Sequence, residues 1–244
     1  MSNPLLDIAS ANNIEDIELC CREFSLAHGF EHFIYADLIP TSFFEPSIVI
    51  ANGYPEAWRN HYAERNYIAS DPVVLHCVSR SDPLVWEDIW KSIDEGSKEY
   101  EFMSEACEYG LCSGVSFSIH SPKTTFGIFS LASALSFEAT REKIELVLPR
   151  GQAFGTQIHN AISNIPQSDS DFENIKQVHL TEREQQCLAF AAEGETSSTM
   201  ASRLNVSEST IIFHLQNATK KLGATNRIQA VAQAITKGIL KPRL

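Results

Sequence analysis

Residues 180–240 read LTEREQQCLAFAAEGETSSTMASRLNVSESTIIFHLQNATKKLGATNRIQAVAQAITKGIL, a stretch whose caps and apolar spacing predict helices. Thr181 and Glu184 have the spacing of a capping box, in which each side chain bonds the other residue's backbone N–H, so a helix should begin there. Gly194 can adopt the left-handed conformation that ends such a helix just after Ala192. The same cues predict three more helices, at 197–204, 207–223 and 226–237.

The third of these helices has two distinct faces. Apolar residues recur at i, i+4, i+7 and i+11 and should face a core; they are Ile211, Leu215, Ala218 and Leu222. The opposite face carries Ser209, Ile212, Phe213, Gln216 and Lys220. A short helix, a tight turn and a second helix with a polar ridge match the helix-turn-helix plan, in which the second helix lies in the major groove. Periodicity alone favours the alternative, a four-helix packing module with a solvated face.

Charge is distributed unevenly along the 244 residues. The formal net charge of -12 argues against a protein that coats nucleic acid by bulk charge, because phosphate binding needs clustered Lys and Arg. Residues 180–244 nevertheless contain eight basic and five acidic residues, whereas the preceding part contains 11 basic and 26 acidic ones. A mildly basic end after an acidic body is typical of a nucleic-acid-binding domain at the C-terminus.

Upstream of residue 180 the pattern changes to mixed strands and helices. Residues 163–179 are polar and acidic and include Pro166, so we predict a linker there, between a domain at 1–162 and one at 180–244. The chain is therefore predicted to be α+β, with an N-terminal α/β/α sandwich on an antiparallel sheet and a small all-α four-helix domain after it. We expect strands near 32–38, 47–52, 114–121 and 125–134, with a hairpin turn around Pro122 and Lys123, and helices over 14–27, 55–65, 97–109 and 139–162.

The cysteines and the N-terminus argue against several other classes of protein. The six cysteines form no CxxC pair and no Cys/His spacing suited to zinc, so we expect reduced thiols and no metal site. The first residues have no basic region ahead of an apolar run, and no apolar run reaches the roughly 18 residues of a membrane span. We therefore expect a cytoplasmic protein without a membrane partner.

The wording of residues 180–240 resembles the LuxR-type DNA-binding domain over essentially its whole length. The resemblance implies that 206–222 contains the recognition helix, with Gln216 paired to adenine and Ile212 and Phe213 against thymine methyls. Glu195 stands where a lysine is usual in this family, so we expect modest phosphate binding and a homodimer on two half-sites of double-stranded DNA. The candidates for phosphate contacts are Thr196, His214, Lys220 and Lys221.

A second resemblance concerns GYPEAWRNHYAERNYIASDPVVLHC at 53–77, together with LVWED at 84–88 and GIFSLA at 127–132. On spacing alone, Trp58 and Tyr62 are core aromatics and Asp71 before a proline is a helix cap, and this plainer interpretation is favoured. Together, however, the three stretches resemble the autoinducer-binding domain of the same LuxR family. The resemblance implies an acyl-homoserine-lactone-like signal.

The residues that carry this resemblance suit a neutral, amide-bearing lactone. The indole N–H of Trp58 can only donate, to the lactone carbonyl, and the carboxylate of Asp71 can only accept, from the ligand amide. Tyr54 and Ser130 offer hydroxyls to the acyl carbonyl. We expect walls formed by Tyr62, Val73, Trp86 and Phe102, with Ile34 as a weaker candidate, and a close backbone approach at Gly114.

The combined interpretation is a quorum-sensing transcriptional regulator without catalytic residues, whose only small-molecule partner is the signal and whose further candidate partner is RNA polymerase. Because Asp71 would lack a partner in an empty site, we expect the signal to stabilise the folded dimer. Three alternatives stay open. They are a lactone-hydrolysing enzyme, although GxSxG, HExxH, P-loop and GxGxxG words are absent; a receiver-type regulator, although repeated βα units are absent; and a family member that answers to another molecule or to none.

Overall fold

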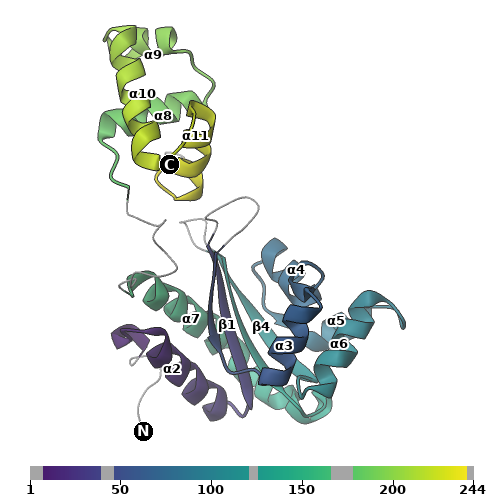
Figure 1. The fold of residues 1–244 in the computed structure, drawn as a ribbon. Coiled ribbons are helices and arrows are strands. Elements are labelled where there is room, and N and C mark those ends of the chain that lie inside the picture. Colours follow the sequence, from purple (N-terminus) through teal and green to yellow (C-terminus); the bar gives the residue numbers. More distant parts are fainter. Residues whose placement is uncertain (1–7, 40–46, 121–125, 166–177, 241–244) are drawn as a thin grey trace. The chain divides into compact units, whose positions relative to one another are not determined.

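The computed structural model describes residues 8–39, 47–120, 126–165 and 178–240, which Figure 1 shows as a ribbon. Backbone contacts divide the chain into two compact units. The first unit consists of a sheet with helices on both of its faces, and the second consists of the C-terminal helices. Each unit has an apolar core of its own and is described by itself.

The first unit is built on a five-stranded sheet in the order β2-β1-β5-β4-β3. β1 pairs with β5, β5 with β4 and β4 with β3, in each case antiparallel. Successive side chains of a strand point to opposite faces, so each strand divides its residues between two cores. The strands are β1 (His32–Ile39), β2 (Ser47–Asn52), β3 (Leu84–Val85), β4 (Ser113–His120) and β5 (Phe126–Ser133).

One face of the sheet is covered by α2 (Ile14–Ala27) and α7 (Phe137–Asn164), with the short η1 (Ile8–Ser10) before them (Figure 1). Phe24 of α2 stacks on Phe154 of α7 with ring centroids 4.0 Å apart, which joins the two helices. Gly151 lets α7 lie directly on β4, because a Cβ there would stand 2.1 Å from the ring of Phe117. This tightly packed core holds the sheet from one side.

The opposite face is covered by shorter helices and one 3-10 turn (Figure 1). Asp71 begins one of them, since its carboxylate accepts the backbone N–H groups of Val73 and Val74, and Pro72 occupies the first turn, where its missing N–H costs nothing. Ser97 caps another by accepting the N–H of Tyr100. These elements are α3 (Glu56–Glu64), η2 (Tyr67–Ala69), α4 (Pro72–Ser79), α5 (Trp86–Ser92) and α6 (Lys98–Glu108).

The predicted fold class and the longer elements of the first unit are confirmed. The sheet is antiparallel between two helical layers, and α2 has the predicted bounds of 14–27. α7 begins two residues before and ends two residues after the predicted 139–162. α4, β3 and α5 were not predicted, because eight residues or fewer give too little periodicity to separate a helix from a strand. The predicted turn at Pro122 and Lys123 lies outside the described residues.

The second unit contains the four predicted helices, α8 (Glu182–Ala192), α9 (Ser197–Leu204), α10 (Glu208–Leu222) and α11 (Arg227–Thr236). The capping box of α8 is confirmed, because Thr181 accepts the N–H of Glu184 and Glu184 accepts the N–H of Thr181. Asn205 ends α9 with a φ of 53°, so α9 and α10 form the two arms of a helix-turn-helix. The predicted core face of α10 is buried in full; it comprises Ile211, Leu215, Ala218 and Leu222.

The expectation that all six cysteines are reduced thiols was wrong. Cys107 at the end of α6 and Cys112 just before β4 are joined by a disulfide, against the expectation of reduced thiols throughout. The bridge depends on the turn through Gly110, whose φ of 87° brings the chain back on itself, and not on a recognisable spacing. Cys20, Cys21, Cys77 and Cys187 are buried and take no part in a disulfide within the described residues. In the described part of the chain, no helix is long and apolar enough to cross a membrane, and no His/Cys/Asp/Glu group is placed to hold a metal ion.

Candidate functional site

The side chains predicted to contact a small ligand converge on the face of the sheet that α3 to α6 cover. Four of them are buried in one apolar core, two tyrosines pack against it, and Asp71 and Ser130 are buried polar residues with 8% and 2% exposure. Segments far apart in sequence are thus brought together, while their role in binding stays a prediction. We call these eight residues the ligand-side cluster: Tyr54, Trp58, Tyr62, Asp71, Val73, Trp86, Phe102 and Ser130.

Asp71 is the charged group of this cluster. Its Oδ1 accepts the N–H of Val73 at 2.8 Å and that of Val74 at 3.3 Å, and its Oδ2 accepts the hydroxyl of Tyr62 at 3.0 Å. Burial raises the pKa of Asp71 to about 6, against the lowering effect of these hydrogen bonds. The expectation that Asp71 lacks partners in an empty site was therefore wrong. Oδ2 can still accept one further hydrogen bond, so capping and ligand binding are compatible.

Aromatic rings form the wall beside Asp71. Trp58 meets Tyr62 and Phe102 edge-on, with ring centroids 5.9 Å and 5.6 Å away, a geometry that aromatic pairs favour. Tyr67, which the sequence did not point to, packs against the same rings, with its centroid 5.1 Å from that of Phe102 and 5.9 Å from that of Tyr62. Trp58 is 4% exposed, and its indole N–H makes no hydrogen bond within the described residues, although it is not one of the fully buried side-chain atoms without a partner. The cluster therefore contains one indole donor that a ligand could engage.

Glu105 of α6 binds two residues at this aromatic wall, Tyr67 and His61. Its Oε2 accepts the hydroxyl of Tyr67 at 2.5 Å and lies 2.6 Å from Nε2 of His61. Hydrogen bonding by Tyr67 and His61 lowers the pKa of Glu105, so the carboxylate form is favoured. α3 and η2 are thereby tied to α6. No sequence signal marked Glu105, because the contact spans segments about 40 residues apart.

Tyr54 and Ser130 form the hydroxyl pair of the cluster. Burial raises the pKa of Tyr54, the charge of Asp71 raises it further, and hydrogen bonding by Ser130 lowers it. The phenol therefore keeps its proton over the whole physiological range and can donate it. Ile34, the weaker candidate for a wall, pairs with Ser130 across β1 and β5 and is half-buried.

Ser116 is a buried residue of the site that sequence reasoning missed. Its Oγ lies 2.7 Å from Oγ of Ser130 and accepts the indole N–H of Trp86 at 2.9 Å. Its position two residues after Gly114 in a predicted strand placed it on the ligand side, which is the signal that could have found it. The expected close approach at Gly114 is present, since a Cβ there would stand 2.5 Å from the carbonyl of Leu131 and 2.9 Å from the ring of Trp86.

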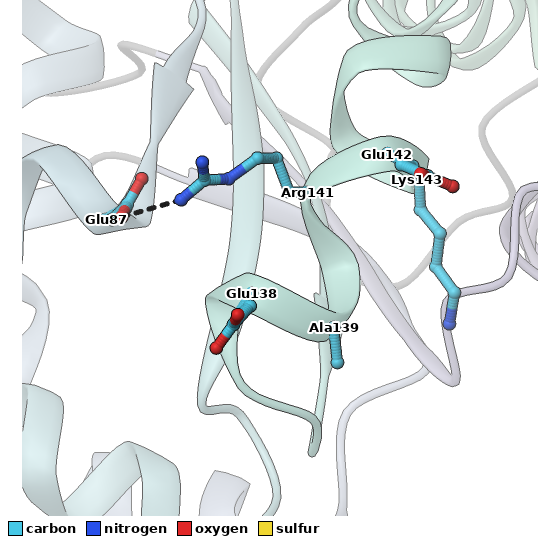
Figure 2. Close-up of a pocket in the computed structure, with 6 residues that line it drawn as sticks. All are labelled: Glu87, Glu138, Ala139, Arg141, Glu142 and Lys143. Carbon is cyan, nitrogen blue, oxygen red and sulfur yellow. Dashed lines mark ion pairs between the residues drawn. The ribbon is translucent and has the colours of Figure 1, made fainter.

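A surface hollow lies away from this cluster, between the start of α5 and the start of α7. Its volume is about 720 Å³, and Arg141 points across it to Glu87 with 3.8 Å between the charged atoms (Figure 2). None of the eight cluster residues lines it. The lining residues are Glu87, Glu138, Ala139, Arg141, Glu142 and Lys143, which are mainly charged and offer no apolar wall for an acyl chain.

The predicted DNA-contacting residues divide into three groups in the structure. Ile212 and Phe213 are 42% and 59% exposed, and Gln216 and Lys220 are exposed beside them on α10, as the helical spacing predicts. Lys221 instead donates to Oε2 of Glu184 at 2.8 Å, which ties the end of α10 to α8. The remaining two candidates are Thr196, which caps α9 and is exposed, and His214, which is half-buried.

Glu195, the acidic residue at a usually basic position, is engaged within the second unit. Its Oε1 lies 2.6 Å from a guanidinium nitrogen of Arg203, and the carbonyl of Glu195 accepts a hydrogen bond from Arg227. The guanidinium of Arg203 also lies over the ring of Phe190, 5.4 Å from its centroid. The charge of Glu195 is thus compensated inside the protein, which reduces the repulsion of phosphate that we expected from the sequence.

Comparison with known proteins gives a separate family match for each of the two compact units. Residues 13–162 match the family described as "Autoinducer binding domain", and residues 178–234 match "Bacterial regulatory proteins, luxR family". The transcriptional activator protein LuxR of Aliivibrio fischeri is 30% identical over 240 residues, which cover 96% of this chain and 91% of that protein. The transcriptional activator protein AnoR of Acinetobacter nosocomialis is 35% identical over 213 residues, 87% of each chain.

The fold also has solved counterparts. SdiA of Escherichia coli superposes with a TM-score of 0.75 and 24% identity, over 97% of this chain and 96% of that one. The transcription factor CepR2 of Burkholderia cenocepacia, described as dependent on N-acylhomoserine lactone, gives a TM-score of 0.52 and 19% identity over 66% of this chain and 89% of that one. At these identities the likeness concerns the fold alone.

Proposed function

The chain belongs to the LuxR family of quorum-sensing transcriptional regulators, in which an autoinducer-binding domain precedes a helix-turn-helix DNA-binding domain, and from this premise we propose that its signal is an N-acyl-homoserine lactone. One observation carries the proposal. The ligand-side cluster combines a buried acceptor, Asp71, with an indole donor, Trp58, that makes no hydrogen bond within the described residues, inside an aromatic wall. A polar group in an apolar site is stabilised when a ligand supplies its hydrogen-bond partner.

The polar atoms of such a lactone match the cluster one by one. The ligand amide N–H donates to Oδ2 of Asp71, which already accepts from Tyr62 and can accept once more. The indole N–H of Trp58 donates to the lactone carbonyl, and the hydroxyls of Tyr54 and Ser130 donate to the acyl carbonyl. Tyr62, Val73, Trp86 and Phe102 surround the ring and the chain, as an apolar site with few directed polar groups should.

The regulator is proposed to act on double-stranded DNA as a homodimer, in the cytoplasm and with RNA polymerase as a further partner. Two apolar side chains one heptad apart on α11, Ile228 and Ile235, are 83% and 47% exposed, which supports a second copy packing there. Dimers of helix-turn-helix units occupy two half-sites about one helical turn apart, which adds the contacts that one recognition helix lacks. The signal is bound and not transformed: incubation with the protein should leave the lactone ring closed.

The experiment that tests the proposal is thermal unfolding of the full chain with lactones of short, medium and long acyl chains. A ligand that binds the folded state stabilises it by about 2.7 kcal/mol at 100 times its Kd, so at least one lactone should raise the unfolding midpoint by several degrees. Asp71→Asn keeps a capping side chain but presents an N–H to the ligand N–H, so its shift should vanish. The matched control is Asp82→Asn, at an exposed residue paired with Arg80, which should keep the full shift. Absence of any shift across the panel would overturn the proposal.

A further inference from the structure

A chain of three buried polar groups runs behind the ligand-side cluster. Nε1 of Trp86 lies 2.9 Å from Oγ of Ser116, and Oγ of Ser116 lies 2.7 Å from Oγ of Ser130. Their residues are 5%, 0% and 2% exposed, so water does not compete for these hydrogen bonds. Ser116 has no other hydrogen-bond partner among the described residues. This hydrogen-bond chain therefore reaches the ligand side at Ser130, next to Tyr54.

The direction of these hydrogen bonds follows from the chemistry of the first group. An indole N–H donates and cannot accept, so the oxygen of Ser116 must be the acceptor for Trp86. The proton of Ser116 then needs an acceptor, because a buried donor without one costs about 1–3 kcal/mol. The acceptor within reach is Oγ of Ser130. Ser116 thus donates to Ser130, and the proton of Ser130 is directed to the ligand side, where its partner is either the phenol oxygen of Tyr54 or an acceptor of the ligand.

We propose that Ser116 is a positioning residue that, with Trp86, fixes the Ser130 hydroxyl as a hydrogen-bond donor toward the acyl carbonyl of the signal. This inference rests on the proposed function, which supplies the carbonyl. The site would therefore select ligands by the acceptor at the acyl position. A ligand of the same shape with a weaker acceptor there should bind less tightly. Ser116 itself does not touch the ligand.

Strand pairing in the sheet fixes the positions of the residues in this hydrogen-bond chain. Ser116 is paired with Ser130 across β4 and β5 and with Leu84 across β4 and β3, so two strands fix its backbone. Gly114 leaves room for the indole of Trp86 to lie against β4, which brings Nε1 to Ser116. A donor whose direction is fixed before binding loses little freedom when the ligand arrives.

The test compares a lactone with its thioamide counterpart, in which sulfur replaces the acyl oxygen and is the weaker acceptor. Kd of both ligands is measured by calorimetry for the unchanged full-length protein and for Ser116→Ala and Trp86→Phe. Each of these two substitutions interrupts the hydrogen-bond chain at a different point. We expect Ser116→Ala to weaken lactone binding by about tenfold, the worth of one directed hydrogen bond, and to weaken thioamide binding much less. Trp86→Phe keeps an aromatic ring but removes the indole N–H. It should likewise lower the ratio of the thioamide Kd to the lactone Kd.

The matched control is Ser118→Ala. Ser118 is equally buried and lies on the same strand and face as Ser116, but it is not part of the hydrogen-bond chain of Trp86, Ser116 and Ser130. It should leave both Kd values within about twofold of the unchanged protein. In a Ser130→Ala background, Ser116→Ala should have no further effect, since the donor that it orients is gone. Melting without ligand identifies any variant that fails to fold, and the remaining variant then decides.

Equal lactone affinity in Ser116→Ala and the unchanged protein would overturn the inference, and so would an equal loss for lactone and thioamide, which is what mere packing damage produces. These results leave the proposed function intact, because the unchanged protein still binds the lactone. If the unchanged protein binds no lactone at all, the proposed function fails and the inference fails with it.

Discussion

The two predicted binding regions of this chain differ in how deeply their polar groups are buried. In the ligand-side cluster, the oxygens of Asp71 and Ser130 are hydrogen-bonded and buried. On the face of α10 that is predicted to contact DNA, which we call the recognition face, Phe213 is 59% exposed and Gln216 is exposed to solvent. Packing and hydrogen bonds hold the groups of the first region in place, whereas those of the second face solvent.

This difference predicts how each region responds to mutation. A change in the ligand-side cluster alters the orientation of fixed groups, so it acts on ligand affinity and also on the stability of the first unit. A change on the recognition face acts on DNA affinity and leaves stability almost unaltered, because exposed side chains contribute little to folding.

The largest effect is expected from Leu215→Ala on the core side of α10. Leu215 is 6% exposed among Met200, Ile211 and other core residues, and loss of a buried leucine side chain costs about 2–5 kcal/mol. Chemical denaturation monitored on the second unit should show this loss. A cost below about 1 kcal/mol would mean that the four-helix core is not as described.

Gln216→Ala, one residue along the same helix, should have the opposite profile. Specific DNA binding should weaken by about 1–3 kcal/mol, while binding to unrelated DNA and the free energy of unfolding stay unchanged. The measurement is fluorescence anisotropy with a selected operator and a scrambled duplex. Equal weakening on both duplexes would assign Gln216 to phosphate and not to a base.

Signal affinity should fall as the pH is lowered through about 6, the value to which burial raises the pKa of Asp71. Protonation replaces one acceptor of Asp71 by a donor that faces the ligand N–H, so we expect about a tenfold loss between pH 7 and pH 5. The empty protein behaves in the opposite way: this carboxyl binds its proton more tightly in the folded than in the unfolded state, so its contribution to stability is present at low pH and is lost as the pH rises through about 6.

Calorimetric titration of the lactone across this range checks the affinity. Asp71→Asn, whose side chain does not titrate, should bind weakly at every pH and show no such transition. An affinity of the unchanged protein that stays constant from pH 7 to pH 5 would contradict the role of the Asp71 carboxylate as acceptor.

The smallest effect is expected from Glu195→Gln. Since Arg203 already compensates this carboxylate, DNA affinity should change by less than about twofold at physiological salt. Lys220→Ala is the comparison variant, because it should lower the slope of log affinity against log salt by about one. An improvement of tenfold or more in Glu195→Gln would show that the acidic side chain does repel phosphate.

Local sequence cues predicted those parts of the fold that depend on neighbours in the chain. The capping box of Thr181 and Glu184, the core spacing of α10 and the positions of the long strands all depend on residues close together in the chain, and the structure confirms each of them. Asp71 shows the same locality, since the plainer interpretation as a helix cap is correct alongside its place in the cluster.

The missed features depend on long-range contacts. Glu105 reaches His61 and Tyr67 from another helix, and Ser116 becomes part of the site through its cross-strand neighbour Ser130 and through Trp86. The disulfide between Cys107 and Cys112 needs a turn that no cysteine spacing specifies. A serine in an alternating strand carries no sign of such partners until the register is known.

Binding of a lactone to the ligand-side cluster through Asp71 is tested most directly by capture followed by native mass spectrometry. The full chain, Asp71→Asn and Asp82→Asn are each incubated with an equimolar mixture of acyl-homoserine lactones, freed of unbound ligand and weighed. We expect one lactone to be retained per chain by the unchanged protein and by Asp82→Asn, and none by Asp71→Asn. Retention of no lactone by the unchanged protein, or equal retention by Asp71→Asn, would show that the cluster does not bind a lactone through Asp71.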